Sequence, residues 1–113
     1  MEPFTEDKPW GWFRVFGKNE PATIKILHVN QGEEFSLQKH AKREEFWRVL
    51  SGHPNITIGD KIISAGPGEE FVIEVNTLHR IEAGDETVEI LEISKGKFDE
   101  KDVVRLKDDY GRA

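Results

Sequence analysis

Four side chains of the kinds that bind divalent cations recur at short spacings in two parts of the chain. Gln38 and His40 lie two residues apart, Glu45 follows five residues later, and His79 lies thirty-four residues beyond Glu45. Glycines that favour turns bracket the two groups at Gly32, Gly52 and Gly68. Two imidazoles, one carboxylate and one amide oxygen suit a borderline divalent ion, zinc first, with Co, Mn, Ni and Fe(II) as further candidates. We therefore expect one metal site formed by both groups.

The surrounding residues indicate how strands would bring these side chains together. If residues 35–40 form a strand, Gln38 and His40 project to the same side of it. A short charged turn then allows the carboxylate of Glu45 to fold back over the pair, and His79 needs only a neighbouring strand. Gln38 is the weakest ligand of the four, because its amide could instead hydrogen-bond a bound water.

Turn residues divide the rest of the chain into short runs of β-branched and aromatic residues. This punctuation predicts an all-β barrel or sandwich. The nine predicted strands span residues 12–16, 23–29, 35–40, 46–51, 56–58, 61–64, 70–73, 79–82 and 88–94. The one helical signal is a short turn that Asp99 would cap, and the polar residues 105–113 are expected to lie along the surface.

Composition limits the classes of protein that fit. A chain of 113 residues, 36% of them hydrophobic, is long enough for one domain with one core. The net charge of −6 and the lack of long Lys or Arg runs argue against general binding to nucleic acid or an anionic membrane. The sequence has no cysteine, no long apolar stretch and no basic-then-apolar start. We therefore expect a cytoplasmic protein.

Two charged residues share a strand face with apolar neighbours and are candidates for the inside of a barrel. Lys25 shares its strand parity with Leu27 and Val29, so its ammonium group is a candidate contact for a phosphate or another oxyanion. Glu92 shares a strand face with Ile90, and a carboxylate buried there would have a raised pKa and could act as a general base. The pattern leaves open which face of the Glu92 strand lies inside.

The other candidates have equally good structural interpretations. Arg43, in the turn before the carboxylate ligand, has the planar fork that suits phosphate but could be an exposed loop residue. Arg80 follows His79 directly, faces away from it on a regular strand, and could equally form a structural ion pair. His28 and His53 belong to no spaced set and are expected to be ordinary surface residues. The aromatic residues near the N-terminus are expected in the core or at a dimer interface: Trp10, Trp12, Phe13 and Phe16.

Together these segments resemble the paired motifs of the cupin superfamily, small double-stranded β-helix barrels with a metal inside. The stretch SLQKH…REEFWRVLSG, with Gln in place of the first histidine of most cupins, is similar to the C-terminal cupin domain of type II phosphomannose isomerases. Further segments agree with that family: KPWGWF at residues 8–13, TIKILHV at 23–29, HRIEA at 79–83 and LEISKGKFDEKDVVRLKDDYGR at 91–112. The resemblance implies an all-β cupin, or jelly-roll barrel, as a single domain over residues 1–113 that pairs as a homodimer.

The resemblance also implies an activity. Type II enzymes of this family convert mannose 6-phosphate to fructose 6-phosphate, an aldose–ketose isomerisation that depends on a divalent metal ion. The ion would be held by Gln38, His40, Glu45 and His79. The candidates for catalysis are then Lys25, Glu92 and Arg80, and those for binding the sugar phosphate are Arg43, Lys25 and Arg80.

Two other functions stay open. One is a non-catalytic metal-binding cupin that binds a sugar or sugar nucleotide, or that partners a separate guanylyltransferase chain, since type II enzymes carry such a domain. The other is an Fe(II) oxygenase, which is disfavoured because Gln38 replaces a histidine that would bind iron more firmly. The chain departs from the family where Ala41 and Lys42 replace two histidines, Phe46 a third, and Glu74 a proline. These departures bear on the proton relay and the fit of the substrate.

Overall fold

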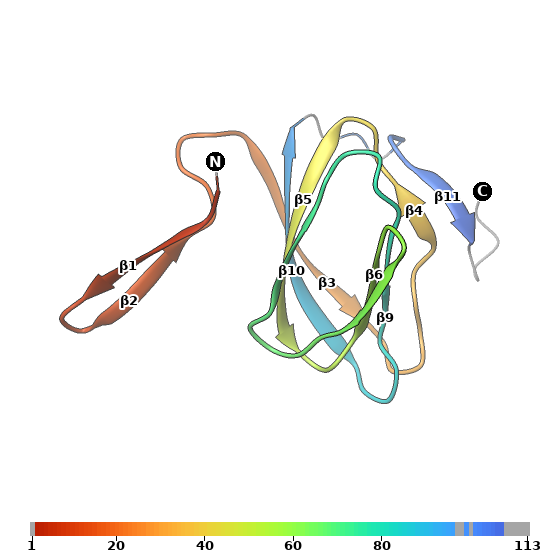
Figure 1. The fold of residues 1–113 in the computed structure, drawn as a ribbon, viewed down its shortest axis with the longest axis horizontal. Coiled ribbons are helices and arrows are strands. Elements are labelled where there is room, and N and C mark those ends of the chain that lie inside the picture. The colour runs from red at the N-terminus through yellow and green to blue at the C-terminus, as the bar shows by residue number, and fades with distance from the viewer. Residues whose placement is uncertain (1, 97–98, 100, 108–113) are drawn as a thin grey trace.

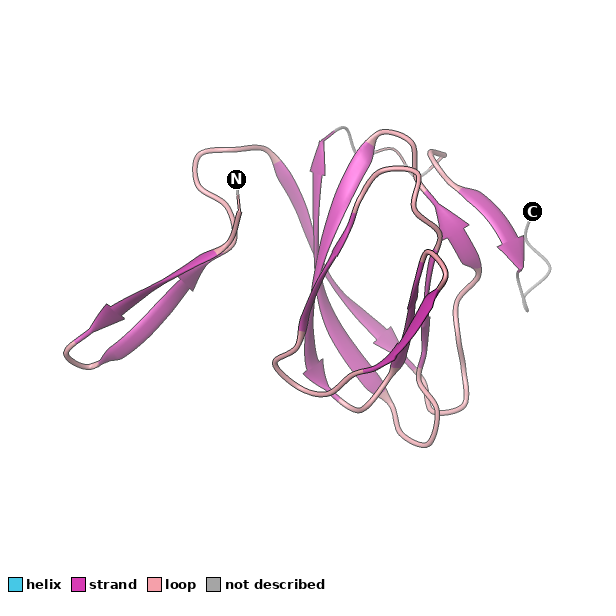
Figure 2. Ribbon diagram, in the orientation of Figure 1, coloured by secondary structure: helices cyan, strands magenta, loops and turns pink. Residues whose placement is uncertain are grey.

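The computed structural model describes residues 2–96, 99 and 101–107. Within these ranges the chain forms eleven strands joined by turns and loops, and no residue is helical (Figure 2). The described part of the chain accordingly contains no helix of the length and apolarity that a membrane span requires. The strands form two curved sheets that face each other, and a separate hairpin (Figure 1). The prediction of an all-β fold is confirmed.

The barrel consists of a four-stranded and a five-stranded sheet. The first has the order β3-β10-β5-β8, formed by β3 (Ala22–Val29), β10 (Val88–Gly96), β5 (Arg43–Ser51) and β8 (Glu70–Ile73). The second has the order β11-β4-β9-β6-β7, formed by β11 (Val104–Lys107), β4 (Leu37–Lys39), β9 (His79–Glu82), β6 (Asn55–Ile58) and β7 (Lys61–Ser64). Neighbouring strands in both sheets are antiparallel. This crossed order is that of the predicted jelly-roll barrel.

The inward faces of the two sheets enclose the core. At one end of β5 and β10 every second residue is apolar and buried, so that Trp47 and Val49 meet Ile90 and Val88 between the sheets. Ile56 on β6 and Ile81 on β9 close the core from the other side, each with no exposed surface. Removing this apolar surface from water is the main force that holds the two sheets together.

Two strands lie outside the predicted set. β1 (Phe4–Lys8) pairs with β2 (Gly11–Val15) in a hairpin that projects from the barrel (Figure 1). β11 was expected to be surface tail and instead extends the five-stranded sheet; residues 108–113 lie outside the described residues. Asp99 does cap a turn, since its carboxylate accepts a hydrogen bond from the amide of Lys101, but the chain then enters β11 without forming a helix.

Candidate metal centre

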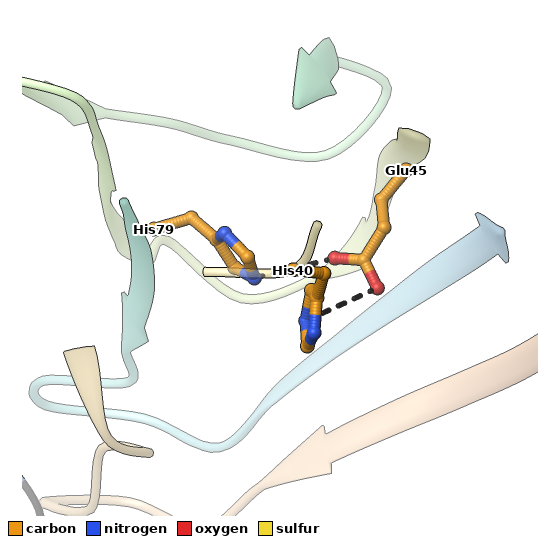
Figure 3. A group of neighbouring side chains, drawn as sticks. All are labelled: His40, Glu45 and His79. Carbon is orange, nitrogen blue, oxygen red and sulfur yellow. Dashed lines mark ion pairs between the residues drawn. The ribbon is translucent and has the colours of Figure 1, made fainter. Parts of the chain in front are cut away.

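His40, Glu45 and His79 meet inside the barrel (Figure 3). His40 follows the end of β4, Glu45 lies on β5, and His79 begins β9. Their exposed fractions are 5%, 1% and 1%. Nε2 of His79 lies 3.3 Å from Oε1 of Glu45, and Nε2 of His40 lies 3.8 Å from Oε2. The two sequence groups therefore converge on one site, with their ligand atoms within 4.8 Å of one another.

Each histidine is held by a backbone carbonyl on the side away from this cluster. Nδ1 of His40 lies 2.6 Å from the carbonyl oxygen of Asp102, and Nδ1 of His79 lies 2.9 Å from that of Thr77. A carbonyl oxygen only accepts, so each Nδ1 carries the proton and each Nε2 presents a lone pair to the cluster. Burial lowers the pKa of both rings, that of His79 to about 4, which keeps them in the neutral form that binds metals.

These three side chains fit a divalent cation. Within the part of the chain that the structure describes, Oε1 of Glu45 is buried without a hydrogen-bond donor and faces the Nε2 lone pair of His79. Such an arrangement is costly unless a cation lies between the facing lone pairs. Two imidazole nitrogens and a carboxylate form a donor set of the kind that holds zinc and related divalent ions.

Gln38, the fourth predicted ligand, lies at the same site. It lies directly opposite His79 in the pairing of β4 with β9, and opposed residues of an antiparallel pair project to the same face. Its side chain is half-buried and lines the same cavity as the three buried residues. The structure thus brings the amide to the site, and its role as a ligand stays a prediction.

Loop contacts hold the two ligand groups in register. The amide of Asn76 donates to the carbonyl of His40 at 2.7 Å, and Asn76 itself adopts the left-handed conformation, with φ +60°, that asparagine tolerates well. The carboxylate of Asp102 accepts hydrogen bonds from the amides of Ala41 and Lys42. No sequence pattern indicates this role of Asp102, because its partners lie sixty or more residues earlier in the chain.

Arg43 is not the exposed loop residue that was one of its two interpretations. It begins β5, is only 7% exposed, and directs its guanidinium into the cluster. Nη2 lies 3.2 Å from Nε2 of His40, Nε lies 3.3 Å from Oε2 of Glu45, and Nη1 donates to the carbonyl of Asp99. Burial raises the pKa of Glu45, and the charge of Arg43 acts against that rise.

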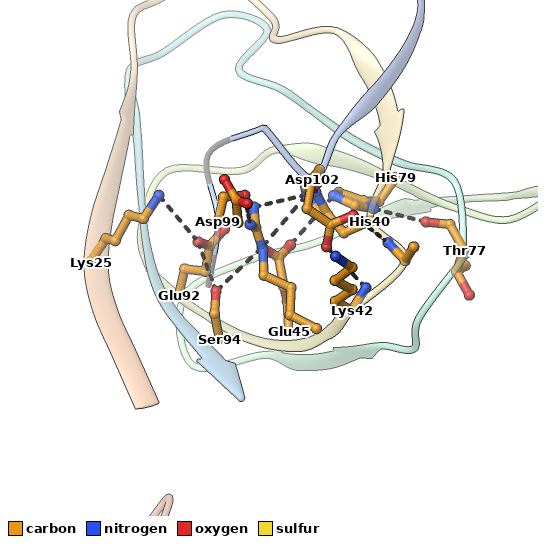
Figure 4. Close-up of polar contacts among 12 residues, drawn as sticks. Lys25, His40, Lys42, Glu45, Thr77, His79, Glu92, Ser94, Asp99 and Asp102 are labelled. Carbon is orange, nitrogen blue, oxygen red and sulfur yellow. Dashed lines mark hydrogen bonds and ion pairs between the residues drawn. The ribbon is translucent and has the colours of Figure 1, made fainter. Parts of the chain in front are cut away.

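A second pair of charged side chains, Lys25 and Glu92, lies beside the cluster and lines the same cavity (Figure 4). Lys25 on β3 is opposite Glu92 on β10, with Nζ 3.9 Å from Oε1. The hydroxyl of Ser94 lies 3.4 Å from both Glu92 Oε1 and Glu45 Oε2, and its single proton bonds to one of them at a time. The predicted inward position of Lys25 is confirmed. The sequence left the face of Glu92 open, and the structure shows that the face of β10 that carries it is the inner one.

The environment of Glu92 favours its protonated form. The carboxylate is 5% exposed. Burial and then the negative charge of Glu45 raise its pKa to about 7, although the ammonium group of Lys25 acts in the opposite direction. A carboxyl group with a pKa near 7 can both accept and return a proton at physiological pH.

The cluster and the charged pair share one cavity of about 220 Å³. It is lined by Lys25, Leu27, Phe35, Gln38, His40, Arg43, Glu45, His79, Glu92 and Arg105. Sequence reasoning missed Arg105, which lies on β11 opposite Gln38. Alternation in a polar tail is a weak signal, and only the pairing of β11 with β4 shows that this arginine faces inward.

The structure does not bring Arg80 to this cavity. Its Nε donates to the carbonyl of Phe35 at 2.9 Å, and its Nη1 lies 3.4 Å from Oε1 of Glu34. Arg80 thus connects β9 to the segment that precedes β4. This is the structural ion pair that was its alternative interpretation. His28 and His53 also lie away from the cluster, each beside a surface glutamate, as expected for ordinary surface residues.

A double-stranded β-helix barrel with a buried His, Glu and His cluster defines a cupin. Residues 4–108 match the model of the family described as mannose-6-phosphate isomerase C-terminal, and the chain belongs to that family. The family and the fold predicted from the sequence motifs are both confirmed.

Individual relatives agree with this assignment. The mannose-1-phosphate guanylyltransferase ManC of Salmonella typhimurium is 33% identical over 107 residues, which cover 93% of this chain and 22% of that protein. The chain spans less than a quarter of the length of the curated relatives that it matches first, at 23% and 22%. A similarity over so small a share does not transfer the activities of those whole proteins to this chain.

Solved structures share the fold. An uncharacterized conserved protein with a double-stranded β-helix domain from Klebsiella pneumoniae has a TM-score of 0.67 at 16% identity, covering 83% of this chain and 81% of that one. A protein proposed to be a sugar phosphate isomerase, from Acidithiobacillus ferrooxidans, has a TM-score of 0.61 at 26% identity, covering 69% of this chain and 51% of that one.

Proposed function

We propose that this chain is a metal-dependent aldose–ketose isomerase that converts mannose 6-phosphate to fructose 6-phosphate. The observation that carries the proposal is the buried carboxylate of Glu92, which lines the same cavity as His40, Glu45 and His79. Family membership and the likeness to a proposed sugar phosphate isomerase support the same reaction.

The residues divide the work as follows. Glu92 takes the proton from C2 of the open-chain sugar and returns it to C1, while a hydroxyl proton passes from O2 to O1, so no second substrate is consumed. A divalent ion held by Gln38, His40, Glu45 and His79 would polarise the substrate oxygens as a Lewis acid. Lys25, opposite Glu92, keeps the carboxylate oriented during the transfer.

Positive charge in the cavity wall suits the phosphate group. Lys25, Arg43 and Arg105 all line the cavity. Arg43 already contacts two of the metal ligands, so we assign the phosphate to Lys25 and Arg105 and not to Arg43. Arg80, which lies outside the cavity, takes no part in this proposal.

The departures from the family pattern lie away from the cavity. Ala41 and Lys42 are exposed in the turn that Asp102 holds, and Glu74 is exposed as well. Phe46 is buried, but on the other side of its strand, against the ring of Phe16. None of these four replaced residues is among the described residues that line the cavity, which favours retained activity.

The alternative is a non-catalytic cupin that acts beside a separate guanylyltransferase chain. The matched relatives favour it, because the similarity to ManC covers only 22% of a protein named for guanylyl transfer. A cavity of about 220 Å³ argues against a bound sugar nucleotide, since pockets for ligands of drug size measure about 300–1,000 Å³.

An isomerase assay with matched variants tests the proposal. Protein loaded separately with Zn, Co, Mn and Ni is expected to convert mannose 6-phosphate, and in D2O the fructose 6-phosphate formed should carry deuterium at C1. Glu92→Gln is expected to keep the metal and lose at least about 100-fold in turnover, because the proton carrier is gone. His53→Ala, a surface histidine, serves as the control. Tight metal binding without turnover in the unmodified chain would favour the non-catalytic alternative.

A further inference from the structure

Ser94 lies between two carboxylates of the barrel interior (Figure 4). It follows Glu92 by two residues on β10, so both side chains point inward, and it stands directly opposite Glu45 in the pairing of β10 with β5. Its hydroxyl oxygen lies 3.4 Å from Oε1 of Glu92 and 3.4 Å from Oε2 of Glu45. The hydroxyl therefore contacts a predicted metal ligand on one side and the proposed proton carrier on the other.

The hydroxyl of Ser94 has one proton for these two acceptors. Ser94 is only 1% exposed, so bulk water does not compete for that proton. Because the two distances are equal, distance does not favour either oxygen, and the proton is drawn to the oxygen that carries more negative charge. The direction of this hydrogen bond therefore depends on the charges of Glu45 and Glu92.

A cation at Glu45 changes the balance between the two acceptors. A bound divalent ion is the largest local charge in its site, so Glu45 becomes a weaker acceptor once its oxygens bind the ion. Glu92 does not belong to the cluster of possible metal ligands, and its carboxylate keeps its own charge. Filling of the metal centre thus makes Glu92 the stronger acceptor for the hydroxyl of Ser94.

Trp47 supplies a second buried donor beside Glu92. It stands directly opposite Glu92 in the pairing of β5 with β10, and it has no exposed surface. Its indole N–H makes no hydrogen bond within the part of the chain that the structure describes. Burial raises the pKa of Glu92, and this N–H acts in the opposite direction, as a donor near a carboxylate does. Glu92 therefore lies between a hydroxyl on its own strand and an indole N–H on the next.

We propose that Ser94 is a positioning residue that links the metal centre to Glu92. While Glu45 carries its full charge, the hydroxyl of Ser94 donates to Glu45. Once Glu45 binds a cation, the hydroxyl turns to Glu92 and, together with the N–H of Trp47, holds that carboxylate in one orientation. Glu92 is thus oriented for proton transfer only when the metal centre is filled. The inference rests on the proposed role of Glu92 as proton carrier, and its first test measures the hydrogen bond without turnover.

Infrared difference spectra of the full chain, with zinc minus without zinc, test this link. The carboxylate stretch of Glu92 is identified as the band that Glu92→Gln removes. Zinc is expected to shift this band in the unmodified chain, because a new hydrogen bond polarises the carboxylate. Ser94→Ala should bind zinc and lose most of the shift, whereas Ser94→Thr, which retains a hydroxyl, should keep it.

The matched control is Ser64→Ala, which removes a serine hydroxyl that donates to Asn55 on the outer part of the other sheet. It should keep the full shift of the Glu92 band. An equal shift in Ser94→Ala and Ser64→Ala would overturn the proposal. So would a Glu92 band that zinc does not move in the unmodified chain, or an unmodified chain that binds no zinc.

Turnover separates this proposal from the isomerase proposal. In Ser94→Ala we expect kcat to fall at least about tenfold and KM for mannose 6-phosphate to change less than about twofold, because the lost hydrogen bond acts on proton transfer and not on binding. Ser94→Thr should recover most of the turnover. An unchanged kcat in Ser94→Ala beside an active unmodified chain would overturn the positioning role. A zinc-dependent shift of the Glu92 band in a chain without turnover would support the link and contradict only the isomerase proposal.

Discussion

The two ends of the barrel interior differ in chemistry although the same strands supply both. Along β5 the inward positions run from Glu45 to Trp47 and Val49, and along β10 they run from Ser94 and Glu92 to Ile90. The alternation of side chains is unbroken, and only the residue types change. One end is a closed apolar core and the other a buried cluster of ionisable groups.

This difference separates the source of stability from the source of function. Apolar side chains at one end gain free energy when they leave water. At the other end the buried ionisable groups lose their hydration, which costs free energy; they are His40, Glu45, His79 and Glu92. Only hydrogen bonds, nearby charges or a bound cation can offset that cost. Changes at the two ends should therefore affect different measurements.

The largest expected effect is on stability at the apolar end. Ile56→Ala is expected to lower the free energy of unfolding by about 2–5 kcal/mol, because Ile56 has no exposed surface and the truncation leaves a cavity. Urea unfolding measures the change. Ile62→Ala, at a residue that is 71% exposed, should stay within about 0.5 kcal/mol. If folded Ile56→Ala lost metal binding, the two ends of the barrel interior would not be independent of each other.

A bound ion should stabilise the fold through the polar end. Zinc at one hundred times its dissociation constant is expected to add about 2.7 kcal/mol to the free energy of unfolding, because it binds the folded state preferentially. Urea unfolding with and without a chelator measures this increment. His40→Ala should abolish it, whereas His28→Ala, at a surface histidine, should preserve it. An equal increment in both variants would place the ion elsewhere.

Removing the positive charge of Arg43 from the cluster tests how that charge affects metal binding. Arg43→Gln is expected to tighten zinc binding by about tenfold, or 1.4 kcal/mol, because the guanidinium contacts His40 and Glu45 and repels a second cation. Competition titration with a chromophoric chelator measures the affinity. Arg48→Gln, on the same strand but directed outward to Glu70, is the control. Weaker binding in Arg43→Gln than in Arg48→Gln would show that Arg43 helps to hold the ion.

The smallest expected effect concerns Glu70, a carboxylate outside the barrel interior. Burial raises its pKa, but hydrogen bonds from Arg14 and Arg48 outweigh burial and hold the pKa below its ordinary value of 4.5. The folded state thus binds the proton less tightly than the unfolded state. The ion pairs therefore stabilise the fold above pH 4.5, and this contribution is lost as the pH falls through the lowered pKa of the folded state.

Glu70→Gln should remove this part of the acid dependence. The free energy of unfolding is expected to fall by about 1 kcal/mol at neutral pH, since the pairs are partly exposed, and by less in acid. Urea unfolding at several pH values measures the difference. The neighbouring and exposed Glu69 supplies the control as Glu69→Gln. A loss that grows in acid would contradict the direction of the pKa shift.

Most of the barrel could be predicted from local pattern alone. Alternation along a single strand placed Lys25 inside, although it left open which face of the Glu92 strand is the inner one. The spacing of Gln38, His40, Glu45 and His79 predicted their convergence. These predictions succeed because side chains two residues apart on a strand point to the same face. An inward apolar residue therefore indicates that the residue two positions away also points inward.

Contacts between distant segments could not be predicted in this way. Arg105 faces the cavity because β11 pairs with β4. Asp102 holds the turn at Ala41 and Lys42 from 61 and 60 residues away. Arg43 was placed in a loop because β5 begins three residues earlier than its apolar run suggests. Pairing between strands decides these positions, and a single sequence carries little information about it.

The most direct test of the metal centre is equilibrium dialysis against zinc, followed by atomic absorption of the recovered protein. The unmodified chain is expected to retain close to one zinc ion, and His53→Ala the same amount, since His53 lies at the surface beside Glu86. His79→Ala should lose the ion, because it removes a buried ligand nitrogen that faces Glu45 at 3.3 Å. Retention of a full ion by His79→Ala, or failure of the unmodified chain to retain any, would contradict the account.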